Sequence, residues 1–287
     1  MKRKLAMVGG DIREGVAADI LIKYGFKLFS YRVPEQKSLK RLRDCLQGAE
    51  VLFLPVRSNL PEGGIYLENN EKLILKAEDL TLLKPNAVIY GGAVSASLKS
   101  EIKKTGHILK EFMENDEIAV PNAVLTAEGT LYEMMSLSKK ACSEWKIGIL
   151  GAGRVGMACA ELLRKVGAGV TVFCRKESDY MSGKNKGFDM RYYAGLASIG
   201  PYFDFLINTV PAPVVSETVI SVLNRDTVII DLASAPGGTD FTCAEQKGMK
   251  AFLLPGVPGK YAPVSAGKIL GNYYLRELCR EEGGVAR

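Results

Sequence analysis

The stretch KIGILGAGRVG, residues 146–156, decides the fold that we expect for this chain of 287 residues. It places the pattern G-x-G-x-x-G directly after a short apolar run and at the start of a helix-like segment. In that setting the first glycine permits a tight turn, the second lets the backbone approach a pyrophosphate, and the third allows close helix–strand packing. The alternative is a glycine-rich turn without a ligand. We predict a dinucleotide-binding Rossmann domain with phosphate contacts at Gly151, Ala152, Gly153, Arg154, Val155 and Gly156.

The residues after the next apolar run indicate which dinucleotide binds. The run at 170–174 is followed by Arg175, Lys176, Glu177 and Ser178. Proteins that prefer NAD usually place an acidic residue there to bind the ribose 2′-hydroxyl, whereas arginine and lysine pair with a 2′-phosphate. The sequence therefore favours NADP, bound through Arg175, Lys176 and Ser178. If Glu177 points at the ribose in place of Arg175, this preference weakens.

Three later loops follow apolar runs at the edge where a Rossmann sheet holds the nicotinamide. They begin at residues 208, 231 and 255, and the second and third are rich in glycine, so their backbone amides can line a small anionic site. Ordinary turn chemistry remains the alternative for any one of them. The predicted cofactor contacts are Asn208, Thr209, Val210, Pro211, Ala233, Ser234, Pro255 and Gly256, with Ser234 also a candidate substrate contact.

Short apolar runs alternate with helix-length segments along both halves of the chain, which predicts an α/β protein with two doubly wound parallel sheets. We expect a flavodoxin- or Rossmann-like substrate domain (residues 1–125 plus a C-terminal helix at about 265–287), a linking helix (126–143), an NADP-binding domain (144–262) and an interdomain cleft. Residues 65–75 read as an excursion or hairpin. The expected strands are 5–8, 27–31, 51–54, 87–90, 146–150, 170–174, 205–208, 228–231 and 251–254, and the expected helices 11–24, 38–47, 95–104, 126–142, 154–166 and 265–282.

The composition excludes several classes of function. The 38 basic and 32 acidic residues give a net charge of +6 that is spread over both halves, unlike the concentrated basic surface of a nucleic-acid-binding protein. The one histidine, His107, argues against a metal site and an imidazole base, and we expect it to cap or line a surface strand. Six scattered cysteines are typical of reduced thiols in a cytoplasmic protein. No apolar run approaches the roughly 18 residues of a membrane span.

The first half offers side chains for an anionic substrate. The turn at residues 9–13 joins a strand to a helix but lacks the third glycine of a dinucleotide site. Asp11 and Arg13 could contact the substrate; alternatively, Asp11 caps the helix and Arg13 is solvated. Arg57 could bind a carboxylate through two hydrogen bonds. Ser58 and Ser95 follow strands that should end at the same sheet edge.

Two residues near the domain junction complete the predicted site. Thr126 is expected to be the N-cap of the linking helix and also suits a substrate contact. Glu128 is a candidate general base in the cleft. Its alternative role is to complement the helix dipole near the helix start.

Five segments, spread over essentially the full chain, carry a resemblance to a known family. They are GGDIR (9–13), NDEIAVPNAVLTAEGT (115–130), GAGRVGM (151–157), DLASAPGGTDF (231–241) and PGVPGKYAPVSAG (255–267). The segment at 231–241 is the most distinctive. Together they resemble the A-subunit family of dipicolinate synthase.

That resemblance implies the last oxidation that yields dipicolinate in the mother cell of a sporulating bacterium. The substrate would be dihydrodipicolinate, or its hydrated tetrahydro precursor, with NADP as oxidant and, as partner, the flavin-binding B subunit of dipicolinate synthase. A small dicarboxylate suits Arg13 and Arg57, and because aromatisation favours loss of the ring proton, a strong imidazole base is less necessary. We also expect a homo-oligomer.

Two alternatives stay open. One is another NADP-dependent dehydrogenase of a hydroxy or keto acid, against which the single histidine counts, since such enzymes commonly use histidine to take the hydroxyl proton. The other is a non-catalytic protein that binds the nucleotide while its partner does the chemistry.

Overall fold

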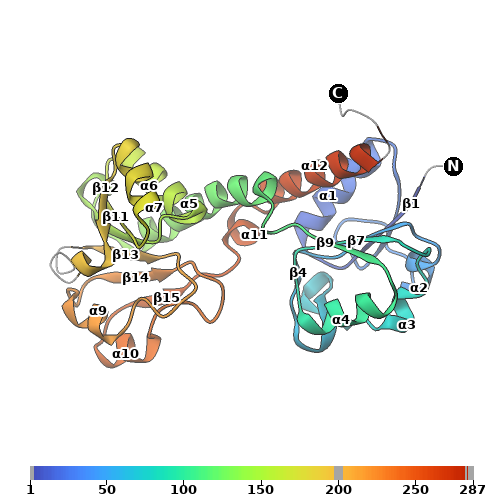
Figure 1. Cartoon of the computed structure of the whole chain (residues 1–287), viewed down its shortest axis with the longest axis horizontal. Coiled ribbons are helices and arrows are strands. Elements are labelled where there is room, and N and C mark those ends of the chain that lie inside the picture. Colours follow the sequence, from blue (N-terminus) through green and yellow to red (C-terminus); the bar gives the residue numbers. More distant parts are fainter. Residues whose placement is uncertain (1–2, 197–202, 282, 284–287) are drawn as a thin grey trace. The chain divides into compact units, whose positions relative to one another are not determined.

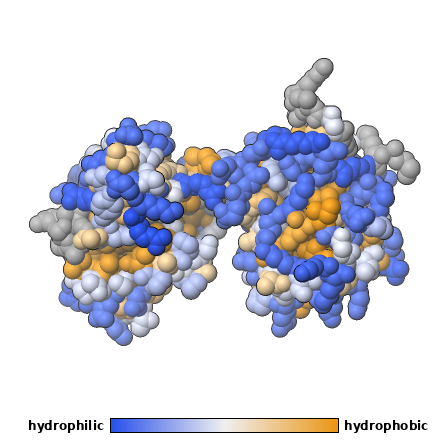
Figure 2. Space-filling model, viewed as in Figure 1, coloured by the Kyte–Doolittle hydropathy of each residue, from blue (hydrophilic) through white to orange (hydrophobic). Residues whose placement is uncertain are grey.

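The computed structural model describes residues 3–196, 203–281 and 283, and the chain divides into two compact units. The first comprises Met1–Asn122 and Ala262–Arg287, and the second Ala123–Tyr261. Each unit contains a parallel sheet with helices packed on it, which confirms the predicted α/β class (Figure 1). Figure 2 shows that hydrophilic residues cover most of the visible face of each unit, with hydrophobic residues in smaller patches.

The main sheet of the first unit has the strand order β2-β1-β3-β7-β9, in which all neighbours are parallel. This is the flavodoxin-like order, and its direction reverses between β1 and β3. Alternate residues of β1 enter opposite cores, with Leu5 and Met7 on one face and Ala6 and Val8 on the other. The strands are β1 (Lys4–Val8), β2 (Lys27–Tyr31), β3 (Val51–Phe53), β7 (Val88–Gly91) and β9 (Ile108–Glu111).

Helices cover both faces of this sheet. Helices α1 (Ile12–Lys23) and α12 (Pro263–Glu281) share one core, and α2 (Leu42–Leu46), α3 (Ala77–Leu80) and α4 (Ala96–Lys104) share the other. The predicted hairpin is present as the antiparallel pair β5 (Gly64–Tyr66) and β6 (Lys72–Ile74), and a short parallel pair joins β4 (Arg57–Ser58) to β8 (Ala93–Val94).

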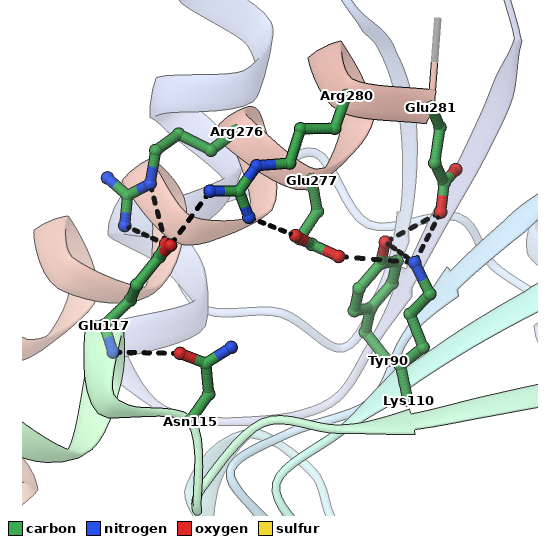
Figure 3. Close-up of polar contacts among 8 residues, drawn as sticks. All are labelled: Tyr90, Lys110, Asn115, Glu117, Arg276, Glu277, Arg280 and Glu281. Carbon is green, nitrogen blue, oxygen red and sulfur yellow. Dashed lines mark hydrogen bonds and ion pairs between the residues drawn. The ribbon is translucent and has the colours of Figure 1, made fainter.

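Charged residues fasten α12 to the rest of the first unit (Figure 3). Glu117 accepts hydrogen bonds of 2.9 Å from both Arg276 and Arg280. Lys110 pairs with Glu281 at 2.8 Å and with Glu277 at 3.2 Å. Glycines in α12 also let it approach α1 closely, because a Cβ at Gly267 would lie 2.7 Å from the carbonyl oxygen of Arg13. Packing and ion pairing therefore both hold the C-terminal helix on this sheet.

The second unit has a six-stranded parallel sheet in the order β12-β11-β10-β13-β14-β15. Counted from β10 as the first strand, this is the order 3-2-1-4-5-6 of the dinucleotide-binding fold. Its strands are β10 (Lys146–Leu150), β11 (Gly169–Cys174), β12 (Asp189–Tyr192), β13 (Phe205–Asn208), β14 (Val228–Asp231) and β15 (Ala251–Leu253), and its shorter helices are α6 (Arg154–Lys165), α7 (Glu177–Asn185), α9 (Glu217–Val222), α10 (Phe241–Gln246) and α11 (Val257–Tyr261).

The long helix α5 (Asp116–Leu137) differs from the sequence prediction, because it begins ten residues before Thr126. Asn115 accepts a hydrogen bond from the backbone N–H of Glu117. Two acidic residues occupy the first turn, where their negative charge interacts favourably with the helix dipole. Pro121 lies inside the helix without ending it. Thr126 is therefore not an N-cap, and Glu128 is not near the helix start.

Other differences concern weakly patterned segments. The helix expected at 38–47 is only the five-residue α2. The strands β9 and β12 have no counterpart in the prediction, and both are edge strands of their sheets with mostly exposed or half-exposed residues. An edge strand needs no continuous apolar run, so its sequence signal is weak. Within the part of the chain that the structure describes, no helix combines the length and apolarity needed to cross a membrane.

Candidate functional site

A pocket of about 250 Å³ lies in the first unit where the direction of the sheet reverses. Its walls come from the turns after β1 and β3 and from the loop of the hairpin, which is the place where open α/β sheets bind ligands. The structure brings three predicted substrate contacts, Asp11, Arg13 and Arg57, to this one pocket. The residues that line the pocket include Asp11, Arg13, Glu14, Arg57, Tyr66 and Asn70.

Asp11 and Arg13 form a two-point ion pair in the wall of the pocket. Nε of Arg13 donates to Oδ1 of Asp11 at 2.9 Å, and Nη2 donates to Oδ2 at 2.7 Å. Burial raises the pKa of Asp11, but the hydrogen bonds and charge of Arg13 outweigh it and lower this pKa overall. Asp11 is also the N-cap of α1, which confirms the alternative that it caps the helix. Arg13 is buried, so the alternative of a solvated side chain is wrong.

Glu14 ties two loops of the pocket together. Its Oε2 accepts a hydrogen bond from the backbone N–H of Asp11, and its Oε1 accepts one from Val56, both at 2.8 Å. The side chain is buried, and burial raises the pKa of Glu14. Sequence reasoning missed this residue, although the spacing D-x-x-E at 11–14 is the signature of a capping box.

Arg57 is the exposed cation of the pocket. Its guanidinium lies 3.8 Å from the centre of the Tyr66 ring, and its Nη1 donates to Oδ1 of Asn70 at 3.3 Å. A guanidinium has five N–H donors, and the bond to Asn70 uses one, so the group can still bind an anion. Tyr66 and Asn70 orient Arg57, and neither carried a sequence signal, because only the hairpin brings them to this place.

The two predicted serines have local roles. The hydroxyl of Ser58 is fully buried and donates to the carbonyl of Pro55, so its prediction as a substrate contact is wrong. Ser95 caps α4 by accepting a hydrogen bond from Leu98 N–H at 3.3 Å, and it is not among the residues that line the pocket. Both side chains are therefore engaged in local hydrogen bonds.

The turn between β10 and α6 has the geometry that a pyrophosphate needs. A Cβ at Gly156 would lie 2.0 Å from the carbonyl oxygen of Gly151, and one at Gly151 would lie 2.4 Å from Oγ1 of Thr209. A Cβ at Gly153 would meet nothing within 4 Å, so the turn presents open space there. Gly153 is the N-cap of α6, with no side-chain hydrogen bond to cap the helix. These residues fit a dinucleotide, since backbone N–H groups at such a helix start bind phosphate.

Basic side chains follow β11, at the predicted place of the adenosine ribose. Arg175, Lys176 and Ser178 are exposed. The carboxylate of Glu177 accepts a hydrogen bond from the hydroxyl of Tyr192, at the end of β12. Glu177 is thus held by a neighbouring strand of its own unit.

Asn208 and Asp231 organise the loops after β13 and β14. Both are fully buried, and Nδ2 of Asn208 donates to Oδ1 of Asp231 at 2.9 Å. Oδ2 of Asp231 accepts from the N–H of Gly238 and the hydroxyl of Thr239. Asn208 is therefore wrong as a direct side-chain contact of a cofactor, because its amide is used inside the protein. Asp231, which shapes the loop, was not predicted.

The other predicted loop residues remain accessible to different degrees. The Thr209 hydroxyl donates to the carbonyl of Leu150 at 2.9 Å, and Ala233 is buried. Val210 is half-buried, while Pro211, Ser234, Pro255 and Gly256 are exposed.

A comparison with known proteins identifies the family. The chain is 32% identical over 292 residues to the A subunit of dipicolinate synthase from Bacillus subtilis (strain 168), covering 98% of each sequence. The chain belongs to the dipicolinate synthase A-subunit family. A family model for the N-terminal domain of that same A subunit matches residues 4–113.

Solved structures agree. The crystal structure of the A subunit of dipicolinate synthase from Bacillus halodurans is 30% identical, with a TM-score of 0.90 over 96% of this chain and 97% of that one. A D-lactate dehydrogenase from Treponema pallidum superposes with a TM-score of 0.61 over 98% of both chains, at 14% identity. At that identity the likeness shows the fold alone.

Three further predicted or candidate residues of this dipicolinate synthase family member, Thr126, Glu128 and His107, lie outside the turn after β1 and the turn after β10. Thr126 is buried in α5, and its carbonyl accepts a hydrogen bond from the Thr130 hydroxyl. Glu128 is exposed in the middle of the same helix. His107 precedes β9, at the amino end of its sheet, and its Nε2 lies 2.9 Å from the carbonyl oxygen of Leu80. No cluster of three potential metal ligands occurs among the described residues.

Proposed function

We propose that this protein catalyses the NADP-dependent oxidation of dihydrodipicolinate, or of its hydrated tetrahydro precursor, to dipicolinate. The observation that carries the proposal is the open turn at Gly153, at the start of α6 in a sheet of dinucleotide-binding order. Membership of the dipicolinate synthase family supplies the substrate class. NADP, when bound, accepts a hydride at its nicotinamide ring.

The second unit would bind this cofactor through two groups of residues. The backbone from Gly151 to Gly156 binds the pyrophosphate, and Arg175 with Lys176 and Ser178 binds the 2′-phosphate. The loops after β13, β14 and β15, which contain Thr209, Ala233 and Pro255, flank the nicotinamide ribose. Asn208 supports these loops from inside the protein. Its Oδ1 accepts a hydrogen bond from the N–H of Val210 in the loop after β13, and its Nδ2 donates to Asp231, which holds the loop after β14.

The pocket of the first unit would bind a carboxylate of the substrate. Arg57 is the main contact, since it is exposed and oriented by Tyr66 and Asn70. The guanidinium of Arg13 is already paired with Asp11, so Arg13 contributes to the electrostatic potential of the pocket more than to direct contact with the carboxylate. Thr126 and Ser234 stay predictions as further substrate contacts.

Aromatisation removes one hydride and one ring proton from the dihydro substrate. Glu128 stays our predicted acceptor of that proton, and its exposed carboxylate is accessible to a ligand. His107 is not suited to the role, because its ring is engaged by Leu80 at the sheet edge opposite to the pocket. Replacement Glu128→Gln removes the base while keeping the shape, so turnover should fall about 100-fold with cofactor affinity unchanged.

The test combines the purified chain with NADP and freshly generated dihydrodipicolinate and follows the ultraviolet absorbance of dipicolinate. We expect product, with tighter binding of NADPH than of NADH. Formation of product only when the flavin-binding B subunit is present would favour the non-catalytic alternative. Turnover of simple hydroxy acids would favour the other dehydrogenase alternative, which the shared fold of D-lactate dehydrogenase allows.

Arg57→Ala tests the pocket directly. Because a charge-assisted hydrogen bond is lost, the dissociation constant of dipicolinate should rise about tenfold in calorimetry. Arg41→Ala is the matched control, since Arg41 is an exposed arginine of the same unit that pairs with Asp44. Equal effects of the two replacements would show that only general charge matters.

We also propose that the chain works with the flavin-binding B subunit of dipicolinate synthase, in the cytoplasm of the mother cell of a sporulating bacterium, and forms a homo-oligomer. The name of the Bacillus subtilis relative, which makes it one of several subunits, supports a companion chain. Sedimentation of the protein with and without this flavoprotein measures both associations.

A further inference from the structure

An acidic side chain beside the predicted 2′-phosphate site, Glu177, is engaged by a tyrosine. Glu177 lies in the first turn of α7, directly after Arg175 and Lys176. The hydroxyl of Tyr192 donates to its carboxylate. This hydrogen bond raises the pKa of Tyr192 to about 12, and the phenol is a protonated donor at neutral pH.

A second contact fixes the ring of Tyr192. It stacks on the ring of Tyr180 with 4.8 Å between the centroids and 8° between the planes. Tyr180 belongs to α7 and Tyr192 to β12, which pairs with β11 in parallel. The tyrosine hydroxyl is thus positioned by the sheet and by the helix together.

The charge of Glu177 affects which dinucleotide can bind beside it. A carboxylate near the end of the second Rossmann strand favours the ribose 2′-hydroxyl of NAD and repels the 2′-phosphate of NADP. Arg175 and Lys176 have the opposite effect, but a carboxylate two residues away can pair with either of them or approach the phosphate itself. If Glu177 is held by Tyr192, the two basic side chains remain for the phosphate.

We infer that Tyr192 is a specificity-determining residue, which holds Glu177 away from the 2′-phosphate and so maintains the preference for NADP over NAD. This inference rests on the proposed function, because it presupposes that NADP binds beside Arg175. Tyr192 acts through Glu177 and is a positioning residue, not a direct contact of the cofactor.

The experiment measures the dissociation constants of NADPH and NADH for the full chain by nicotinamide fluorescence. In Tyr192→Phe the ring stays but the donor is lost, so Glu177 is released. The ratio of the NADH to the NADPH constant should fall about fivefold, which is the size of effect typical of one exposed charge. The change should shrink at high salt, because screening weakens interactions between exposed charges.

The double variant Y192F/E177Q separates the indirect role from a direct one. Removing the charge of Glu177 should restore the wild-type ratio, since the released side chain then carries no charge to repel the phosphate. If Tyr192 instead contacts the 2′-phosphate itself, the double variant keeps the loss, and the inference is overturned. Tyr180→Phe is the matched control, because it removes a hydroxyl from the partner ring of the stack and should leave the ratio unchanged.

The remaining outcomes are also distinct. A wild-type chain that binds NADPH more tightly, with an unchanged ratio in Y192F, overturns the inference and leaves the proposed function intact. A wild-type chain that binds neither dinucleotide, or both equally, overturns the proposed function and the inference with it. Circular dichroism of each variant shows whether the fold is retained, and E177Q alone, which leaves Tyr192 in place, should keep or increase the preference for NADPH.

Discussion

Two turns of this molecule start from similar sequence and end in different chemistry. Each joins the first strand of a parallel sheet to a helix through glycines, after β1 at Gly9 and Gly10 and after β10 at Gly151 and Gly153. In the first unit, the space beside Gly10 is filled by the carboxylate of Glu14, which would lie 2.5 Å from an added Cβ. In the second unit, the space beside Gly153 is open.

The difference lies in how each helix start is satisfied. In α1 the first backbone N–H groups are bonded by Asp11 and Glu14, which form a capping box. The N-cap of α6 is Gly153, which has no side chain to cap the helix. A helix start whose backbone N–H groups are already bonded by its own side chains leaves fewer donors for a phosphate, whereas an uncapped helix start presents its N–H groups to the phosphate. The same local geometry therefore builds a turn that is satisfied from within, the structural turn, in one unit and, as we propose, a turn for a ligand, the ligand turn, in the other.

The largest effect is expected for Gly156→Ala, which places a methyl group against the backbone of the ligand turn. The new Cβ would lie 2.0 Å from the carbonyl oxygen of Gly151, which is backbone and cannot rotate away. We expect a loss of about 3 kcal/mol in the free energy of unfolding and no measurable NADPH binding. Urea unfolding and nicotinamide fluorescence measure the two quantities. A stable variant with normal affinity would mean that the turn can shift, and the comparison would fail.

A smaller effect, confined to binding, is expected for Gly153→Ala. The added methyl meets no protein atom within 4 Å, and the φ of −77° is one that alanine adopts readily. Stability should therefore stay within about 0.5 kcal/mol of wild type. The methyl occupies the path by which the pyrophosphate approaches, so the dissociation constant of NADPH should rise about 30-fold. An unchanged constant would show that this space is not the ligand site.

The smallest effect concerns pH, and it comes from the structural turn. Because the pKa of Glu14 is raised in the folded state, its contribution to stability is full below its ordinary value of 4.5 and is lost as the pH rises through the folded value. Glu14→Gln removes this dependence and one backbone hydrogen bond, at a cost of about 1 kcal/mol. The stability advantage of wild type over this variant should therefore shrink from pH 4.5 to pH 8 in urea unfolding.

Asp11→Asn is the matched comparison with the opposite sign. Its pKa is lowered, so its contribution is present above the ordinary value of 3.8 and is lost as the pH falls through the folded value. Asparagine keeps the N-cap, so the difference from wild type reports the pairing with Arg13. Parallel slopes for the two variants would contradict the assigned environments.

Much of the fold was predictable because buried parallel strands are continuous apolar runs. The predicted ranges 146–150, 205–208 and 228–231 coincide with strands in the interior of the second sheet. The edge strands β9 and β12 were missed, since one exposed side removes the apolar signal. The start of α5 was misplaced because Pro121 suggests a boundary, while Asn115 and two acidic residues begin the helix earlier.

The candidate site divides in the same way. Gly151, Gly153 and Gly156 could be assigned from spacing, because their roles depend on backbone geometry within one strand–helix unit. Asn208 was misassigned, since its buried partner Asp231 lies on a strand 23 residues further along the chain. Polar residues at strand ends look alike in a sequence, whether they face a ligand or each other.

The sequence by itself therefore determined the α/β class, the dinucleotide turn and the family resemblance, all of which depend on short-range patterns. Only the tertiary structure decided that Asp11, Arg13 and Arg57 share one pocket, that Glu14 accepts a hydrogen bond from Val56 and that Tyr192 engages Glu177. Each of those contacts joins segments that are distant in the chain. Their distances follow from strand order and side-chain packing, which no local pattern of residues encodes.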